Sequence, residues 1–170
     1  MPTFLLLALA LATPTRPMPT AALLYSPTRH VRTTDKVVQQ LLKWGAERSY
    51  TFARLLTRLE FTDVCVYVER STKLPHNVDA RMLIVPTAGP RRYVRIQLAD
   101  PPPGEPADAV ALLAHELWHA LEVSGAPEVH DEATLAEFYK RIGQRTIGEN
   151  VFDTAAAHAT GARVRKELGA

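Results

Sequence analysis

The residues best suited to chemistry lie in the pentapeptide 115–119, which reads His-Glu-Leu-Trp-His. If this segment is helical, His115 and His119 lie one turn apart on the same side, so both imidazoles can reach one metal ion. Glu116 then lies about 100° around the helix, where its carboxylate can reach a water molecule on that metal without being a ligand. This HExxH spacing predicts a zinc site with Glu116 as general base. The alternative is that both histidines are ordinary, partly buried residues.

The residues on both sides of the pentapeptide predict the helix that the site needs. Glu105, Pro106 and Asp108 are typical of a helix N-terminus. Gly125, followed by Pro127, is typical of a helix end. Apolar residues recur at helical spacing and form a core-facing stripe: Val110, Leu113, Ala114, Leu117 and Leu121. The histidines fall on the opposite side, as expected for a helix that buries one face and directs a site from the other.

A catalytic zinc ion usually has three protein ligands and a water molecule, so the two histidines require a further donor. The candidates in the later chain are Glu122, Glu128, His130, Glu149, Asp153 and His158. Asp153 is preferred, because a final helix would place it in line with Ala157 and Val164, where a buried carboxylate needs a strong partner. Glu149, one turn earlier, is the next choice. The alternative for Asp153 is a carboxylate that is stabilised by the helix dipole at the helix start.

Glu122 lies on the same side of the predicted helix as the histidines. One straight helix places its three side chains along a line more readily than around a tetrahedron, so Glu122 is not the preferred ligand. It fits better as a hydrogen-bond acceptor for a ligand histidine, or as an anchor for a neighbouring helix.

Helical and strand patterns elsewhere predict the frame around the site. The other predicted helices cover residues 34–59 (as one or two helices), 131–142 and about 150–168. The predicted strands cover residues 63–69, 81–85 and 93–98. The last strand alternates a solvent-facing and a buried face, and Gly45 marks either a helix break or a close contact. The fold class is therefore α+β: N-terminal helices, a small three-stranded sheet with a hairpin, the HExxH helix and a C-terminal ligand-bearing helix.

Length and composition limit the possible classes of protein. The 170 residues suit one domain, and 46% hydrophobic residues are ordinary for a globular core. A net charge of +2 is too small to indicate a nucleic-acid partner. Cys65 is the single cysteine, which rules out an intrachain disulfide, and its apolar neighbours indicate a core residue.

The N-terminal segment predicts export. Residues 1–12 contain an apolar stretch that suits a signal-peptide core and is too short for a membrane span. We expect residues 1–30 to be a signal peptide with a disordered segment, and residues 31–170 to be the domain of a secreted or periplasmic protein. No Lys or Arg precedes the stretch, so a wrong start site or a short hydrophobic arm on a cytoplasmic protein is the alternative. No later segment is apolar enough to span a bilayer.

With HELWH, a downstream carboxylate and a preceding short sheet, the chain resembles the zincin metallopeptidases, most closely the small gluzincin-like ones. The resemblance covers about residues 60–165, and the pentapeptide is its specific part. It implies that His115 and His119 bind Zn²⁺ and that Glu116 is the general base for a zinc-activated water that hydrolyses a peptide bond. A carboxylate from a later helix completes the zinc shell; it is usually Glu, so Asp153 departs from the pattern.

The resemblance also implies a peptide or protein substrate that lies antiparallel to the edge strand beside the helix, a role that falls to residues 93–98. The candidate donors to the oxyanion are Tyr139, His130 and His158. Metzincins are a poor match, because Glu122 and Gly125 stand where their extended motif has Gly and His. The alternatives to a peptidase are an inactive zinc-binding interaction module and a metal-dependent hydrolase of non-peptide amides.

Overall fold

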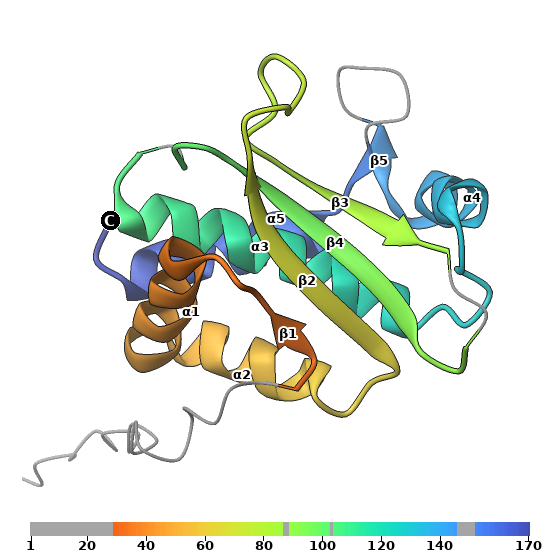
Figure 1. Ribbon diagram of the computed structural model, residues 1–170, viewed down its shortest axis with the longest axis horizontal. Coiled ribbons are helices and arrows are strands. Elements are labelled where there is room, and N and C mark those ends of the chain that lie inside the picture. The colour runs from red at the N-terminus through yellow and green to blue at the C-terminus, as the bar shows by residue number, and fades with distance from the viewer. Residues whose placement is uncertain (1–28, 87–88, 103, 146–151) are drawn as a thin grey trace, which may run out of the picture.

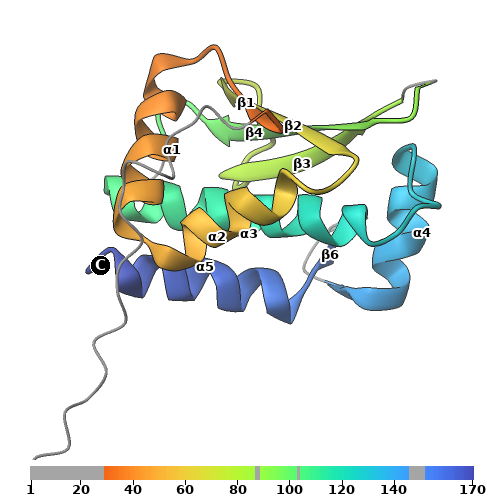
Figure 2. The ribbon, with the colours of Figure 1, turned by 90° about the horizontal axis from the view of Figure 1, so that it is seen from below.

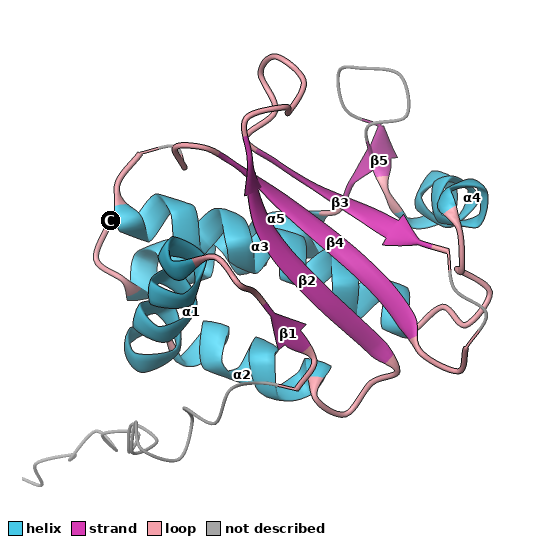
Figure 3. Cartoon of the chain, in the orientation of Figure 1, coloured by secondary structure: helices cyan, strands magenta, loops and turns pink. Residues whose placement is uncertain are grey.

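The computed structural model describes residues 29–86, 89–102, 104–145 and 152–170. In these residues the chain forms an α+β fold with five helices, a four-stranded mixed sheet and a small two-stranded sheet. Figure 1 and Figure 3 show the order of the elements, which are β1 (Val31–Arg32), α1 (Lys36–Arg48), α2 (Tyr50–Leu59), β2 (Val64–Ser71), β3 (Ala80–Val85), β4 (Arg92–Ala99), α3 (Pro106–Ser124), α4 (Glu132–Ile142), β5 (Gln144–Arg145), β6 (Phe152–Asp153) and α5 (Ala155–Glu167). The predicted signal peptide falls on residues outside this description and stays a prediction.

The N-terminal helical segment is divided into two helices at Ser49. The Ser49 hydroxyl accepts a hydrogen bond from the Phe52 amide at 3.1 Å, so the residue that ends α1 also caps the start of α2. Gly45 lies inside α1 and does not break it. A Cβ atom at Gly45 would lie 2.6 Å from Val110 Cγ1, so this glycine marks a close contact between α1 and α3.

The main sheet has the strand order β1-β2-β4-β3. Strand β2 is parallel to both β1 and β4, whereas β3 and β4 are antiparallel neighbours. The expected three strands are therefore four, because the two-residue β1 is too short to show any periodic pattern. The expectation that residues 93–98 form the edge strand is wrong: β4 lies between β2 and β3, and β3 is the edge that contacts α3.

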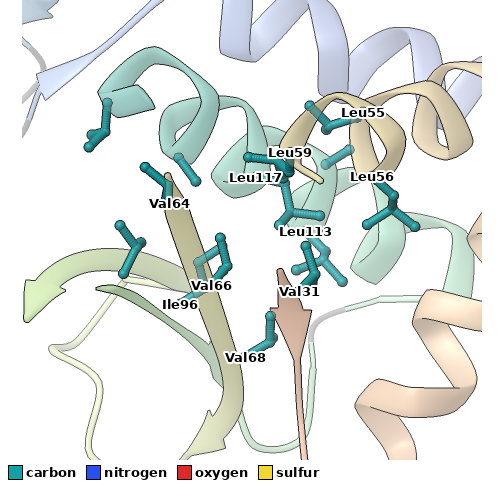
Figure 4. Packing of buried hydrophobic residues seen from close by; sticks show 14 of the residues in the cluster. Val31, Leu55, Leu56, Leu59, Val64, Val66, Val68, Ile96, Leu113 and Leu117 are labelled. Carbon is teal, nitrogen blue, oxygen red and sulfur yellow. The ribbon is translucent and has the colours of Figure 1, made fainter. Parts of the chain in front are cut away.

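The core lies between one face of the sheet and helices α1, α2 and α3. Val94, Ile96 and Leu98 of β4 are fully buried, and the residues between them are more exposed, so the predicted alternation is confirmed. The stripe predicted for α3 is also buried: Val110, Leu113, Ala114 and Leu117 are inaccessible and Leu121 is partly buried. Figure 4 shows Ile96 of β4, Leu113 and Leu117 of α3 and Leu55 and Leu59 of α2 in this core. Each large aliphatic side chain contributes about 1.5–3 kcal/mol by leaving water.

Helix α3 lies between the sheet and α5 (Figure 2), so both of its long faces are covered. The approach of α5 is close at Gly161, where a Cβ atom would lie 3.0 Å from the backbone oxygen of Ala111 and 3.5 Å from His115 Cβ. The side of α3 that carries the histidines therefore meets the last helix. In the described residues, no helix is both long and apolar enough to cross a membrane.

The last predicted helix begins later than expected. Its predicted start near Asn150 is wrong, because Phe152 and Asp153 pair with β5 as strand β6. Thr154 is the N-cap: its hydroxyl accepts a hydrogen bond from the Ala157 amide at 3.1 Å, so the helix starts at Ala155. Asp153 therefore lies just before the helix and not on it.

Candidate metal centre

Helix α3 presents both histidines of the pentapeptide at one place. The helix starts as the sequence predicts, with Pro106 in its first turn and with Asp108 Oδ2 accepting a hydrogen bond from the Glu105 amide at 3.1 Å. One turn separates His115 from His119, and their Nε2 atoms lie 3.2 Å apart. The two ring nitrogens therefore converge as the spacing predicts.

Asp153 meets these two nitrogens although it lies on a different element from the one expected. Its Oδ1 atom lies 3.2 Å from His115 Nε2 and 3.4 Å from His119 Nε2. The same oxygen accepts a hydrogen bond from the Thr154 amide at 2.7 Å. The start of α5 thus positions the Asp153 carboxylate, because the residue that caps the helix also holds this oxygen.

The three converging atoms have the spacing of a metal site. They form a nearly equilateral triangle with sides of 3.2, 3.2 and 3.4 Å. In a tetrahedral site with bonds of about 2.0–2.1 Å, neighbouring ligand atoms lie about 3.3 Å apart, so the triangle fits three corners of that tetrahedron. His115, His119 and Asp153 are therefore a group that could hold a metal ion.

Glu122 supports the site from one turn further along α3. Its Oε2 atom lies 2.9 Å from His119 Nδ1, and its Oε1 atom accepts hydrogen bonds from Thr154 Oγ1 at 2.7 Å and from Trp118 Nε1 at 3.0 Å. Burial raises the pKa of Glu122, but these hydrogen bonds outweigh it and keep the pKa below its usual value. Glu122 is thus the acceptor that the sequence predicts, and it also ties α3 to the start of α5.

Tyr139 of α4 forms the wall behind His119. Its ring packs edge-on against the His119 ring with centroids 5.3 Å apart, and its hydroxyl lies 3.4 Å from both the His119 backbone oxygen and Glu122 Oε2. Burial raises the pKa of the Tyr139 phenol, so the hydroxyl stays protonated. The Tyr139 hydroxyl therefore contacts the His119 backbone and the Glu122 carboxylate.

The charges at the site are set by burial and by the short distances. Burial and the proximity of His119 lower the pKa of His115 to about 4. Burial also lowers the pKa of His119, but its hydrogen bonds to Asp153 and Glu122 outweigh burial and raise the pKa to about 9. Burial raises the pKa of Asp153, but the hydrogen bond to His119, the nearby His115 ring and the Thr154 amide keep this pKa below its usual value. At neutral pH these pKa values leave His115 neutral and His119 protonated, and a metal ion at the group would displace the His119 proton.

Glu116 is buried beside this group. Burial raises the pKa of Glu116 to about 7; the neighbouring His119 opposes this shift and the Asp153 charge adds to it. A carboxylic acid with a pKa near 7 can accept and release a proton at neutral pH. The position next to His115 on α3 and the raised pKa are what a general base at this site requires.

Of the other candidates for the third metal ligand, two lie away from the site, one falls outside the described residues and one lies beside Asp153. Glu128 and His130 have side chains that are 51% and 64% exposed; Glu128 pairs with Arg141, and His130 bonds to the Glu128 backbone oxygen. Glu149 falls outside the described residues. His158 does lie at the site, with Nε2 2.7 Å from Asp153 Oδ2.

Thr154 is the site residue that the sequence reasoning missed. Its hydroxyl caps α5 and donates to Glu122, and its amide holds Asp153. A threonine directly before the run Ala155–Ala157 is a recognisable N-cap signal, and it would have placed the helix start correctly.

Comparison of the chain with protein-family models, with curated proteins and with solved structures found no match. The interpretation of this site therefore depends on its residues and their geometry.

Proposed function

We propose that the chain is a zinc-dependent hydrolase of the HExxH type that cleaves peptide bonds. The observation that carries the proposal is the convergence of His115 Nε2, His119 Nε2 and Asp153 Oδ1 within 3.4 Å of one another, with the buried Glu116 on the same helix. Two imidazoles and one carboxylate are a usual ligand set for a catalytic zinc ion, and they leave a position for water or substrate.

We assign a separate role in hydrolysis to each side chain of the site. When bound, the metal ion supplies Lewis-acid chemistry, which acidifies water and polarises a carbonyl group. Glu116 accepts the proton of the attacking water and returns it to the leaving amine, a role that suits a buried carboxylate next to His115 on the same helix. Glu122 accepts the Nδ1 proton of His119, which fixes the tautomer and directs Nε2 towards the metal position.

The outer edge of β3 is the place where we propose that a peptide binds. Ile84 of β3 directs its amide away from β4, since that amide donates to Glu132 Oε1 of α4 at 3.1 Å. Met82 has the same orientation, because residues two apart in a strand face the same way. An extended peptide can pair with the outward backbone groups of Met82 next to α3, beyond the Ile84 amide that Glu132 occupies, so β3 takes the role that the sequence assigned to residues 93–98.

The same three ligands also occur in non-haem iron oxygenases, which bind Fe²⁺ through two histidines and one carboxylate. The buried Glu116 favours hydrolysis, since a general base next to the ligands serves the activation of water. Metal analysis of the purified protein distinguishes a zinc hydrolase from an iron oxygenase. Bound zinc would support the hydrolase, and bound iron would contradict it.

The proposal is tested by comparing wild type with Glu116→Gln, using metal analysis and cleavage of a peptide library. We expect one zinc ion per chain in both proteins and a loss of about 10²–10⁴-fold in cleavage rate in the variant, because only the general base is removed. Glu137→Gln, at a side chain that is 71% exposed, is the matched control and should cleave like wild type. Equal cleavage by Glu116→Gln, or a wild type that binds no zinc, would contradict the proposal.

A further inference from the structure

His158 lies on the first turn of α5 and contacts two of the three residues of the metal group. Its Nε2 atom lies 2.7 Å from Asp153 Oδ2, and its ring packs edge-on against the His115 ring, with centroids 5.0 Å apart and planes at 76°. The side chain is nevertheless 67% exposed. Because it contributes little to the core, its contacts at the site are its main interactions.

The contacts of Asp153 show what His158 does there. The Thr154 amide donates to Oδ1, which also faces the two imidazoles, whereas His158 Nε2 lies 2.7 Å from Oδ2 of the same carboxylate. Rotation of the carboxylate would break the Thr154 hydrogen bond or separate Oδ2 from the His158 ring nitrogen. If His158 Nε2 carries a proton towards Oδ2, the same nitrogen has no lone pair with which to bind a metal ion.

We propose that His158 is a positioning residue that holds Asp153 so that Oδ1 alone is presented to the metal ion. The inference rests on the proposed metal site and goes beyond it. A carboxylate that binds through one oxygen leaves a coordination position open for water or substrate, whereas binding through both oxygens would fill it. His158 thereby keeps the site suitable for catalysis without being a ligand.

The experiment measures zinc affinity by competition with a chromophoric chelator for wild type, His158→Ala and His158→Gln. We expect His158→Ala to weaken binding about 10–100-fold, as the loss of a partner to a metal ligand usually does. His158→Gln retains an N–H donor and should recover most of the loss. His76→Ala, at an exposed histidine in the turn between β2 and β3, is the matched control and should bind like wild type.

The same variants are then saturated with Co²⁺, whose visible absorption reports the number and type of its ligands. We expect His158→Gln to reproduce the wild-type bands and the thermal unfolding of the metal-free variants to match that of wild type. Unchanged zinc affinity in His158→Ala would overturn the proposal and leave the metal site intact. A loss that Gln does not recover, with shifted cobalt bands, would make His158 a ligand and also overturn it. A wild type that binds neither metal would instead refute the proposed function itself.

Discussion

At the scale of single residues, the geometry of the site depends on the neighbours that contact each metal-facing side chain. Glu122 fixes His119, while the Thr154 amide and His158 fix the two oxygens of Asp153. Preorganised ligands bind metal tightly because little ordering remains to be done when the ion arrives. The partners of the ligands should therefore matter nearly as much as the ligands.

The first prediction concerns Glu122. Glu122→Gln should weaken zinc binding about 10–100-fold, because an amide of the same shape keeps the packing and removes the charge that orients His119. The pKa of His119 in the metal-free protein should fall from about 9 for the same reason. Chelator competition measures the first effect and NMR titration of the imidazole measures the second. Glu128→Gln, at an exposed ion pair, is the control; a Glu122→Gln protein with wild-type affinity would refute the role.

The second prediction is a pH dependence of metal binding. The metal-free pKa of His119 is about 9, so His119 is protonated below that pH, while His115, with a pKa of about 4, is neutral. Zinc must displace the His119 proton, so the apparent affinity should rise about tenfold per pH unit from pH 7.5 and level off above pH 9. Calorimetry at pH 7.5 in two buffers of different protonation enthalpy should detect about one proton released per zinc. Affinity that is independent of pH over this range would contradict the proton assignment.

At the scale of elements, α3 is held at its C-terminal end by Arg92 of β4. The Nη1 atom of Arg92 donates to the backbone oxygens of Val123, Ala126 and Val129 at 2.6–3.1 Å, and the rest of the guanidinium pairs with Asp63. A cation at this position also interacts favourably with the negative end of the helix dipole. One nearly buried side chain thus joins the sheet to the helix that carries the site.

The third prediction follows from this contact. Arg92→Met should lower the free energy of unfolding by about 2–4 kcal/mol, because several buried carbonyl groups lose their hydrogen-bond donor. Arg95→Met, on the same strand but with a side chain that is 47% exposed, should cost less than about 1 kcal/mol. Urea unfolding of both variants measures the difference. Equal stabilities would show that Arg92 does not anchor α3.

At the scale of the whole molecule, the position of Asp153 depends on how α5 docks. Thr154 joins the start of α5 to Glu122, and at the other end Glu167 accepts hydrogen bonds from Ser49 and Thr51 at the start of α2. The metal group therefore forms only when the last helix lies along α3. Zinc should stabilise the folded chain as a whole, because it binds the assembled site.

The parts of this arrangement that depend on nearby residues could be predicted from the sequence. The spacing of His115 and His119, the buried stripe of α3 and the hairpin of β3 with β4 are local patterns. Asp153 was singled out because it would share an apolar face of the last helix with Ala157 and Val164. The structure places it beside the histidines, but on β6 and not on that helix, so the residue is right and the helical premise is wrong.

The parts that depend on distant residues could not be predicted. The insertion of β4 between β2 and β3, which makes β3 the edge strand, is decided by pairing between segments far apart in the chain. The contact of Gly45 with Val110 requires the packing of α1 on α3. His158 was predicted only as one of several candidate ligands and oxyanion donors, and its contact with Asp153 depends on the docking of α5.

The most direct test of the central claim is a crystal structure of the protein with one equivalent of zinc, with anomalous diffraction measured on both sides of the zinc absorption edge. We predict one anomalous peak within about 2.0–2.2 Å of His115 Nε2, His119 Nε2 and Asp153 Oδ1. Glu116 should lie beside the peak and not bind it. A zinc-treated crystal with no peak at this group, or with its peak at other residues, would contradict the account.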